Sequence, residues 1–405
     1  MSEIKKSIKL KHVAYDVRGP VLDAASEMEA RGETILKLNI GNPAPFGFEA
    51  PEEVVNAIAC HLSAAEGYSD SRGIRSAREA IAEYHIKKGV QGVTIEDVYT
   101  GNGVSELINM TMQALLSPGD EILIPSPDYP LWTASATLAG GTVRHYICDE
   151  SSDWMPDISD IRAKITSKTR GIVLINPNNP TGAVYAPELL EQIVKLAYEH
   201  DLVLFADEIY DRMTMDGYTH TPLASISSDV FCVTFNGLSK SHLIAGYRVG
   251  WMVLSGNKAN AKSYIEGLNM LSSMRLCSNV PGQYAIPAAL KCLESTSPML
   301  VPGGRVYEQR RVICDALESI PGISLVRPKA TFYCFPKIDA KSFGIINDER
   351  FVLDFLREKK VLLVHGRAFH WPDPDHFRIV YLPNVDVLAD AAGKLRDFLE
   401  TYHQD

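Results

Sequence analysis

The chain has 405 residues and a formal net charge of -10, and 46% of its residues are hydrophobic and 22% charged. This composition excludes a disordered or fibrous chain, and its acidic balance argues against a nucleic-acid-binding surface, which would be basic. The sequence has no run of about 18 apolar residues, so we expect neither a membrane-spanning helix nor a membrane partner.

The cysteines and the N-terminal residues indicate the compartment. Seven cysteines are scattered along the chain without a CxxC pair, so neither a disulfide framework nor a bound metal is expected. Residues 1–19 contain lysines but no apolar segment of signal-peptide length. We therefore expect a protein of the reducing cytoplasm.

Predicted strands and helices alternate along the chain. A helix is predicted over residues 105–116, and another follows Pro187, where Leu189, Ile193 and Leu196 share one face. The predicted strands are strongly apolar, as in a sheet covered on both faces. They span residues 121–125, 171–175, 202–206, 231–235, 250–254, 361–364 and 378–382. This alternation predicts an α/β fold with a mainly parallel sheet, in which ligands bind at the carboxyl ends of the strands.

Proline and glycine interrupt this pattern at residues 297–304, which indicates a domain boundary. We predict a large domain over residues 51–297 and a small C-terminal domain over residues 298–405. Residues 1–50 are predicted to form an N-terminal arm and part of the small domain.

Two loops at predicted strand ends have the composition of ligand-binding turns. TGNGVSE, residues 100–106, opens a helix, and backbone N–H groups at a helix start attract phosphate. By itself this segment is equally compatible with an ordinary turn. NPNNPTG, residues 176–182, is made rigid by two prolines and presents the amides of Asn178 and Asn179.

Charged side chains follow two further predicted strands. Asp207 comes directly after residues 202–206, and a buried carboxylate there needs a cation, such as a protonated ring nitrogen, or several donors. Tyr210 is placed to reach a phenolate-type oxygen. Lys240 follows residues 231–235, where apolar neighbours can lower the pKa of the amine, as Schiff-base chemistry requires.

Two arginines complete the set. Arg248 can clamp a phosphate, and Arg378 begins a predicted strand, where a guanidinium can bind a carboxylate through two hydrogen bonds. Each charged residue alone is compatible with an ordinary ion pair or a surface charge. Together they provide what pyridoxal phosphate and an amino acid require.

The chain resembles the fold-type-I pyridoxal-phosphate-dependent aminotransferases in the order of its motifs. These are NPNNPTG, DEIY, SK, an arginine eight residues after the lysine and an arginine in a late strand. Within them the chain is most similar to the bacterial glutamate–pyruvate (alanine) aminotransferases, through LNIGNPAPFGF, DYPLW, NGLSK and RGP. The resemblance extends from about Val13 to the end. It implies a large, mainly parallel-sheet domain and a smaller α/β domain. It also implies exchange of an amino group between L-alanine/pyruvate and 2-oxoglutarate/L-glutamate, in a ping-pong mechanism serving alanine biosynthesis.

The resemblance assigns catalytic and cofactor-binding roles. Lys240 forms the Schiff base and transfers the proton, Asp207 keeps the ring nitrogen protonated, and Tyr210 holds the ring hydroxyl oxygen together with Asn179. The other residues implied to contact the cofactor are Gly103, Val104, Ser105, Tyr129, Ser239 and Arg248, with Tyr68 from a neighbouring subunit, which implies a homodimer. Related enzymes often have a serine three positions before the lysine; here the residue is Gly237, and Ser239 can substitute for it.

Substrate binding is also implied by the resemblance. Gly41, Asn179 and Arg378 hold the α-carboxylate. For the distal carboxylate of glutamate there are two candidates, Arg18 with Tyr15 beside it and Arg275 from a neighbouring subunit; we favour Arg18, because a movable arm can withdraw when alanine binds.

Other functions remain as alternatives. A carbon–sulfur lyase would share Lys240, Asp207 and Arg378, and an aminotransferase preferring aromatic, branched or aspartate donors would share the whole set. A ligand-sensing module is disfavoured by the retained lysine, and a dehydrogenase by the absent glycine fingerprint. HGRAFHWPDPDH, residues 365–376, has three histidines without zinc spacing, and we expect a loop near the substrate entrance. Trp132 and Trp251 are expected in the core.

Overall fold

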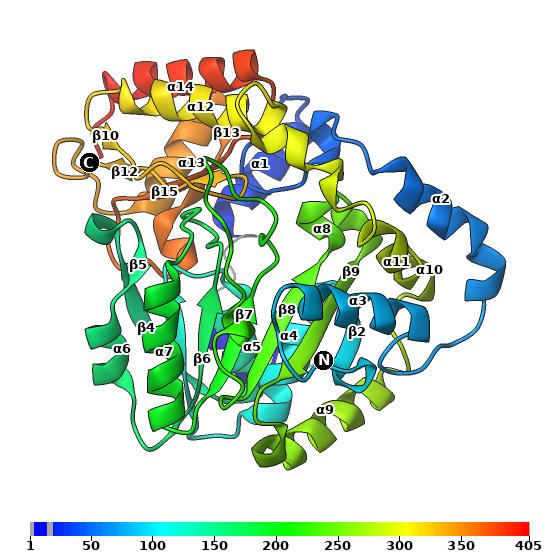
Figure 1. Ribbon diagram of the computed structural model, residues 1–405. Coiled ribbons are helices and arrows are strands. Elements are labelled where there is room, and N and C mark those ends of the chain that lie inside the picture. Colours follow the sequence, from blue (N-terminus) through cyan, green and yellow to red (C-terminus); the bar gives the residue numbers. More distant parts are fainter. Residues whose placement is uncertain (1–3, 14–18, 405) are drawn as a thin grey trace.

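A computed structural model describes residues 4–13 and 19–404 of the chain. Its centre is an eight-stranded sheet, whose strands run side by side through the lower half of the molecule in Figure 1. The strands, in sheet order, are β2 (Val98–Asn102), β9 (Val249–Ser255), β8 (Cys232–Gly237), β7 (Val203–Asp207), β6 (Thr169–Ile175), β3 (Glu121–Ser126), β4 (Thr142–Asp149) and β5 (Met155–Pro156). From β8 to β4 all pairings are parallel, whereas β9 and β5 run antiparallel to their neighbours. The predicted α/β class with a mainly parallel sheet is confirmed.

Both faces of the sheet are covered, and this explains why its strands are so apolar. Along β6, Ile172 and Leu174 pack into one hydrophobic cluster, while Val173 and Ile175 pack into another on the opposite face. Helices cover the first face: α2 (Glu52–Cys60), α3 (Arg75–Lys87), α6 (Ile158–Lys164), α7 (Pro187–Glu199) and α11 (Ala285–Ala289). The second face packs against α4 (Val104–Leu115), α5 (Leu131–Ala139) and α9 (Lys262–Met274).

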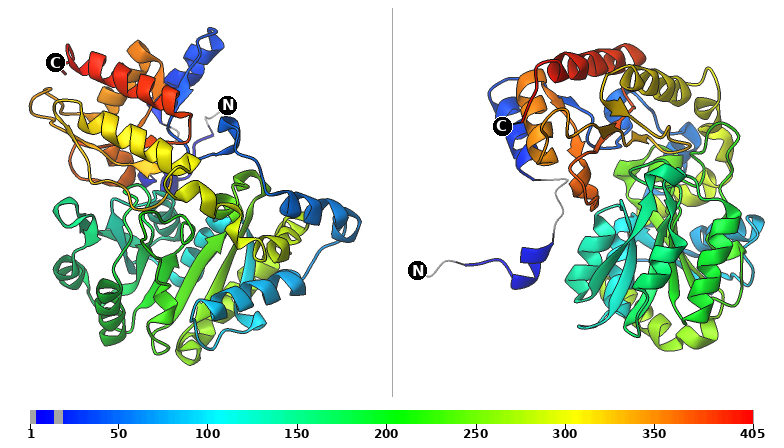
Figure 2. Two further views of the ribbon diagram at one scale, coloured as in Figure 1. Left: turned by 45° about the horizontal axis from the view of Figure 1, so that its top comes forward. Right: turned by 90° about the vertical axis from the view of Figure 1, so that its left-hand side faces the viewer.

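A third hydrophobic cluster lies beside the large sheet and combines the two ends of the chain. Val21, Ala25 and Met28 of α1 (Pro20–Ala30) pack there with the C-terminal helices. These are α12 (Arg305–Glu318), α13 (Asp348–Lys359) and α14 (Val385–Leu399), and α1 lies beside α13 in Figure 2. This clustering agrees with the idea that residues before 50 join the small domain, but the domain bounds stay a prediction.

Short strands complete this part of the chain. They are β1 (Leu36–Lys37) with β13 (Val361–Leu362), β10 (Ile323–Ser324) with β12 (Lys337–Ile338), and β11 (Tyr333–Cys334) with β15 (Phe377–Val380) and β14 (Val364–His365). The single strand predicted over residues 361–364 is wrong: the chain changes partner at Leu363, because β13 pairs with β1 and β14 pairs with β15. Two further short helices, α8 (Leu238–Ser241) and α10 (Val280–Gln283), lie at the edge of the large sheet.

In the described part of the chain, no helix combines the length and apolar character needed to cross a membrane.

Candidate active site

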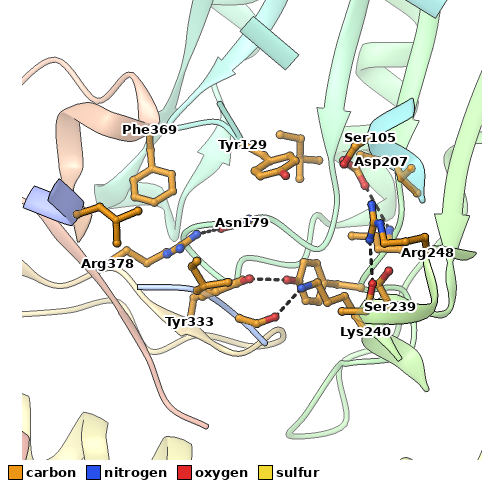
Figure 3. A pocket seen from close by; sticks show the side chains of 18 residues that line it. Ser105, Tyr129, Asn179, Asp207, Ser239, Lys240, Arg248, Tyr333, Phe369 and Arg378 are labelled. Atoms are coloured by element: carbon orange, nitrogen blue, oxygen red, sulfur yellow. Dashed lines mark hydrogen bonds between the residues drawn. The ribbon is translucent and has the colours of Figure 1, made fainter. Parts of the chain in front are cut away.

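A pocket of about 310 Å³ lies where the carboxyl ends of β6, β7 and β8 face the third hydrophobic cluster. Figure 3 shows two arginines at its opposite ends, Arg378 and Arg248. Predicted site residues that line it are Gly41, Val104, Ser105, Tyr129, Asn179, Asp207, Tyr210, Ser239, Lys240, Arg248 and Arg378. The structure therefore brings together groups that are up to several hundred residues apart in sequence.

Asp207 is the last residue of β7, and its carboxyl group is buried in the pocket wall. Burial raises its pKa from 3.8 to about 6, and two N–H donors offset this rise only in part. These donors are the indole Nε1 of Trp132, 3.0 Å from Oδ2, and the backbone N of Ile209, 3.4 Å from Oδ1. Trp132 is a core residue, as predicted, and it also supports Asp207. A cation brought next to Asp207 would stabilise its charged form.

Lys240 lies in the short helix α8, directly after β8, and its amine enters the pocket. Its Nζ donates a hydrogen bond to the carbonyl oxygen of Gly41 at 2.7 Å and lies 6.0 Å from the centre of the Tyr210 ring. The N-terminal part of the chain thus contacts the reactive amine directly.

A pair of tyrosines lies beside this amine. The Tyr210 hydroxyl donates to the Tyr333 hydroxyl at 2.8 Å, and both side chains are buried. Burial opposes ionisation of Tyr333, but cationic Lys240 and Arg378 and the hydrogen bond from Tyr210 outweigh it and lower the pKa of the Tyr333 phenol. Burial, followed by the nearby Tyr333, raises the pKa of Tyr210. These opposite shifts agree with Tyr210 being the hydrogen-bond donor of the pair.

The Arg378 end of the pocket is suited to a carboxylate. Arg378 Nη1 donates to Asn179 Oδ1 at 2.9 Å, and Nη2 donates to the carbonyl oxygen of Asn39. Its guanidinium carbon lies 4.3 Å from the ring centre of Tyr333 and 4.6 Å from that of Phe369. Aromatic rings and hydrogen bonds thus fix the orientation of a buried planar cation.

The Arg248 end is suited to a phosphate. Val104 and Ser105 line it at the start of α4, where backbone N–H groups are free of helical partners. The guanidinium of Arg248 donates to Ala245 O at 2.9 Å and to Asn102 O at 3.2 Å. A Cβ on Gly103 would lie 2.3 Å from Arg248 Nη2, so the backbone of Gly103 borders the arginine although Gly103 does not itself line the pocket.

The departure at Gly237 has a steric reason. A Cβ there would lie 2.6 Å from the carbonyl oxygen of Val249 and 2.9 Å from the Cα of Gly250, on the neighbouring strand β9. No side chain fits without moving backbone atoms. Ser239 lines the pocket two residues later, so a hydroxyl is available from the next turn of the chain.

Besides Gly103, four predicted residues are not placed in this pocket. Tyr15 and Arg18 lie outside the described residues. Tyr68 does not line the pocket of its own chain and is 82% exposed. Arg275 does not line it either; its guanidinium bonds Glu106, the carbonyl of Ser71 and that of Thr100. The roles of Tyr68 and Arg275 across a subunit interface, and of Arg18 with Tyr15 on a movable arm, stay predictions.

Tyr333 and Phe369, which sandwich Arg378, are not among the residues predicted from the sequence. The strand pairing explains the position of Tyr333: β11 pairs antiparallel with β15, which carries Arg378, in the register Tyr333 to Val380, and the sequence alone does not give this register. Since Arg378 and Val380 share a strand face, Tyr333 had to lie diagonally beside Arg378. Phe369 lies in the turn Gly366–Phe369, which has no comparable pattern.

The pocket residues fit pyridoxal phosphate. The buried carboxyl of Asp207 would pair with its ring nitrogen, and the amine of Lys240 would bind its aldehyde. The phenol of Tyr210 suits the ring hydroxyl, and the start of α4 with Arg248 suits the phosphate. Arg378, at the far end from Arg248, remains for a substrate carboxylate (Figure 3). Among the described residues, no group of three or more His, Cys, Asp or Glu side chains is arranged to hold a metal ion.

Comparison with known proteins agrees with this chemistry. The family model for aminotransferase class I and II matches residues 33–392. The chain is 57% identical over 404 residues to the glutamate–pyruvate aminotransferase AlaA of Escherichia coli K12, covering all of both chains. It is 53% identical to an alanine aminotransferase of Mycobacterium bovis, over 98% of this chain and 93% of the relative. A crystal structure of an aminotransferase from Escherichia coli superposes with a TM-score of 0.99 at 57% identity, over the whole of both chains.

Proposed function

This chain belongs to the family of class I and II aminotransferases, and we propose on that premise that it exchanges an amino group between L-alanine/pyruvate and 2-oxoglutarate/L-glutamate. It is an enzyme, a transaminase that uses pyridoxal phosphate. The observation that carries the proposal is that one pocket holds the amine of Lys240 together with the buried carboxyl of Asp207 and, at one end, the guanidinium of Arg378.

Bound pyridoxal phosphate supplies an electron-withdrawing ring that stabilises the negative charge left on the substrate Cα when its proton is removed. Lys240 would hold the cofactor, and its free amine would take up the proton from the substrate Cα and hand it back. Asp207 would keep the ring nitrogen protonated, because an ion pair offsets the cost of burying its carboxylate. Tyr210 and Asn179 would hold the ring hydroxyl oxygen, and Tyr129 the ring face.

The carboxylate-binding end determines how the substrate is oriented. Arg378 and Asn179 bind the α-carboxylate, and the rings of Tyr333 and Phe369 exclude water from the guanidinium faces. A substrate held by this end presents its Cα–H towards Lys240. Since the same groups bind amino acids and 2-oxo acids, both half-reactions of a ping-pong cycle use one site.

The distal carboxylate of glutamate needs a further cation. Arg18 remains our candidate. Arg275 is already paired with Glu106 and bonded to two backbone carbonyls, so recruiting it would break three contacts. An arginine that can withdraw would allow the small methyl group of alanine to occupy the same place.

We also propose a homodimer in which Tyr68 reaches the phosphate of the neighbouring subunit. Tyr68 is 82% exposed in the single chain, and Met274 and Leu276 at the end of α9 are exposed as well. A partner subunit would cover these side chains if they lie in its interface. A cytoplasmic location and a role in alanine biosynthesis complete the proposal; the first rests on the cysteine pattern and the second on the proposed substrates.

A donor-by-acceptor screen on the purified, cofactor-loaded protein tests the substrates. Alanine with 2-oxoglutarate should be among the best pairs, with pyruvate and glutamate formed in equal amounts. Release of ammonia and a thiol from a cysteine-type donor would indicate the carbon–sulfur lyase instead. Strong preference for aromatic, branched or aspartate donors would retain the transaminase and replace its substrate.

A further inference from the structure

The loop between β14 and β15 belongs to the small sheet at both its ends but packs on the large domain. Ala368, Phe369 and Trp371 are buried in the hydrophobic cluster formed by one face of the eight-stranded sheet and its helices. The sequence analysis singled out the histidines of this loop, and the proposed function uses only Phe369. We asked what fixes the loop in place.

His370 connects the loop to the segment that follows β3. Its Nδ1 lies 2.7 Å from Oδ1 of Asp128, and its ring stacks on His145, with ring centres 4.7 Å apart and planes 19° from parallel. The carbonyl oxygen of His370 accepts a hydrogen bond from Ser126 Oγ at 2.7 Å. His370 therefore contacts the large domain through its ring edge, its ring face and its backbone.

Asp128 is a fully buried carboxyl group whose two oxygens both have partners. Oδ1 meets His370, and Oδ2 accepts a hydrogen bond from Thr133 Oγ1 at 2.6 Å. Removing the partner of a buried carboxylate is costly, because its desolvation is then uncompensated. The contact with His370 is thus a strong constraint on both segments.

The residues next to this contact line the active-site pocket. Phe369, which precedes His370, accepts a hydrogen bond from the backbone N of Asp128 at 2.9 Å, and its ring lies against Arg378. Tyr129, which follows Asp128, lines the pocket on the cofactor side. A shift at the His370–Asp128 contact would therefore move a wall of the carboxylate-binding end relative to the cofactor.

We propose that His370 is a positioning residue for the substrate carboxylate: by binding Asp128 and stacking on His145 it holds Phe369 against Arg378. The inference rests on the proposed function, in which Arg378 binds the α-carboxylate. His370 does not line the pocket and acts through Phe369. Its loss should weaken carboxylate binding while the cofactor and Lys240 remain in place.

The test compares His370→Phe, which keeps a ring on His145 but loses the hydrogen bond, with His370→Asn, which keeps a donor near the position of Nδ1. Calorimetry with propionate, an alanine analogue without an amino group, reads carboxylate binding without turnover. We expect His370→Phe to raise the Kd of propionate and the KM of alanine about tenfold. The kcat should change less than threefold, and the absorbance spectrum of the bound cofactor should stay as in wild type. His370→Asn should bind propionate more tightly than His370→Phe.

A merely structural role would give a different pattern. A partly unfolded variant has fewer active molecules, so kcat per total protein falls while KM and the propionate Kd stay as in wild type. That result would overturn the proposal. In a double-mutant cycle, Asp128→Asn combined with His370→Phe should weaken propionate binding no more than the larger single change, whereas additive effects would contradict the contact. Failure of the wild type to transaminate alanine would refute the proposed substrate but leave the propionate comparison intact.

Discussion

At the scale of single residues, the buried carboxylate of Asp207 lowers the stability of the folded protein when no cofactor is bound. In the cofactor-free protein its pKa is about 6, against 3.8 for the free side chain, because burial disfavours the charge. Between these values the folded state binds more protons than the unfolded state, so stability falls as pH rises through this window. The full loss is about 3 kcal/mol, of which about 1.4 kcal/mol falls between about pH 5 and 7.5.

Asp207→Asn removes this titration, so we expect the variant to gain stability relative to wild type as pH rises from about 5 to 7.5. Urea unfolding of both cofactor-free proteins across this range measures the difference. Glu208, whose pKa is raised by burial to about 7, titrates in both proteins and largely cancels. In the cofactor-loaded protein the difference should shrink or reverse, because the protonated ring nitrogen then pairs with the carboxylate. A pH-independent difference in the cofactor-free proteins would contradict the burial argument.

At the scale of elements, three adjacent strands place glycines side by side below the start of α4. Gly250 of β9 pairs with Gly101 of β2 and with Gly237 of β8. A Cβ on Gly250 would lie 2.5 Å from the backbone N of Val104, so the sheet leaves no room for a methyl group beneath the proposed phosphate cradle. The packing of these strands thus sets the position of the helix start.

Gly250→Ala should push the backbone of Gly103 and Val104 and weaken cofactor binding by about ten- to a hundredfold. Absorbance titration of the cofactor-free variant with pyridoxal phosphate measures the Kd. Gly267→Ala is a matched control. Gly267 lies within helix α9, and a Cβ there would meet only Ala114, at 3.7 Å or more. That variant should bind the cofactor normally and gain about 0.4–1 kcal/mol of stability. Wild-type affinity in the Gly250 variant would show that the cradle tolerates displacement.

The elements also show which parts of the molecule can be predicted from sequence. Asp207 and Lys240 each directly follow an apolar run, and carboxyl ends of parallel strands meet at one edge, so their convergence was predictable. The strand β4 was missed because its first four residues, Thr142 to His145, are exposed or partly exposed and include polar side chains, so they interrupt the apolar pattern. Phe369 was missed because the turn after the two-residue strand β14 reaches the pocket only through packing between distant segments, which local sequence does not record.

At the scale of the whole molecule, the pocket of one chain contains the lysine, the buried carboxyl and both arginines, but not Tyr68. If Tyr68 completes the phosphate site of a partner, the dimer has two sites, each built from both chains. Lys240→Ala then disables the site of its own chain, whereas Tyr68→Ala weakens the site of the partner. This difference makes the arrangement testable without a structure of the dimer.

We expect the two variants, each nearly inactive at limiting pyridoxal phosphate, to regain activity when they are unfolded and refolded together. In a mixed dimer, one site then combines both changes and the other has neither. Random pairing makes half of the dimers mixed, so about one quarter of wild-type activity should return. Size-exclusion chromatography confirms the dimer, and each variant refolded alone is the control. If Tyr68 served its own chain, every site would carry one defect and mixing would restore nothing, because no combination of chains could then assemble an unaltered site.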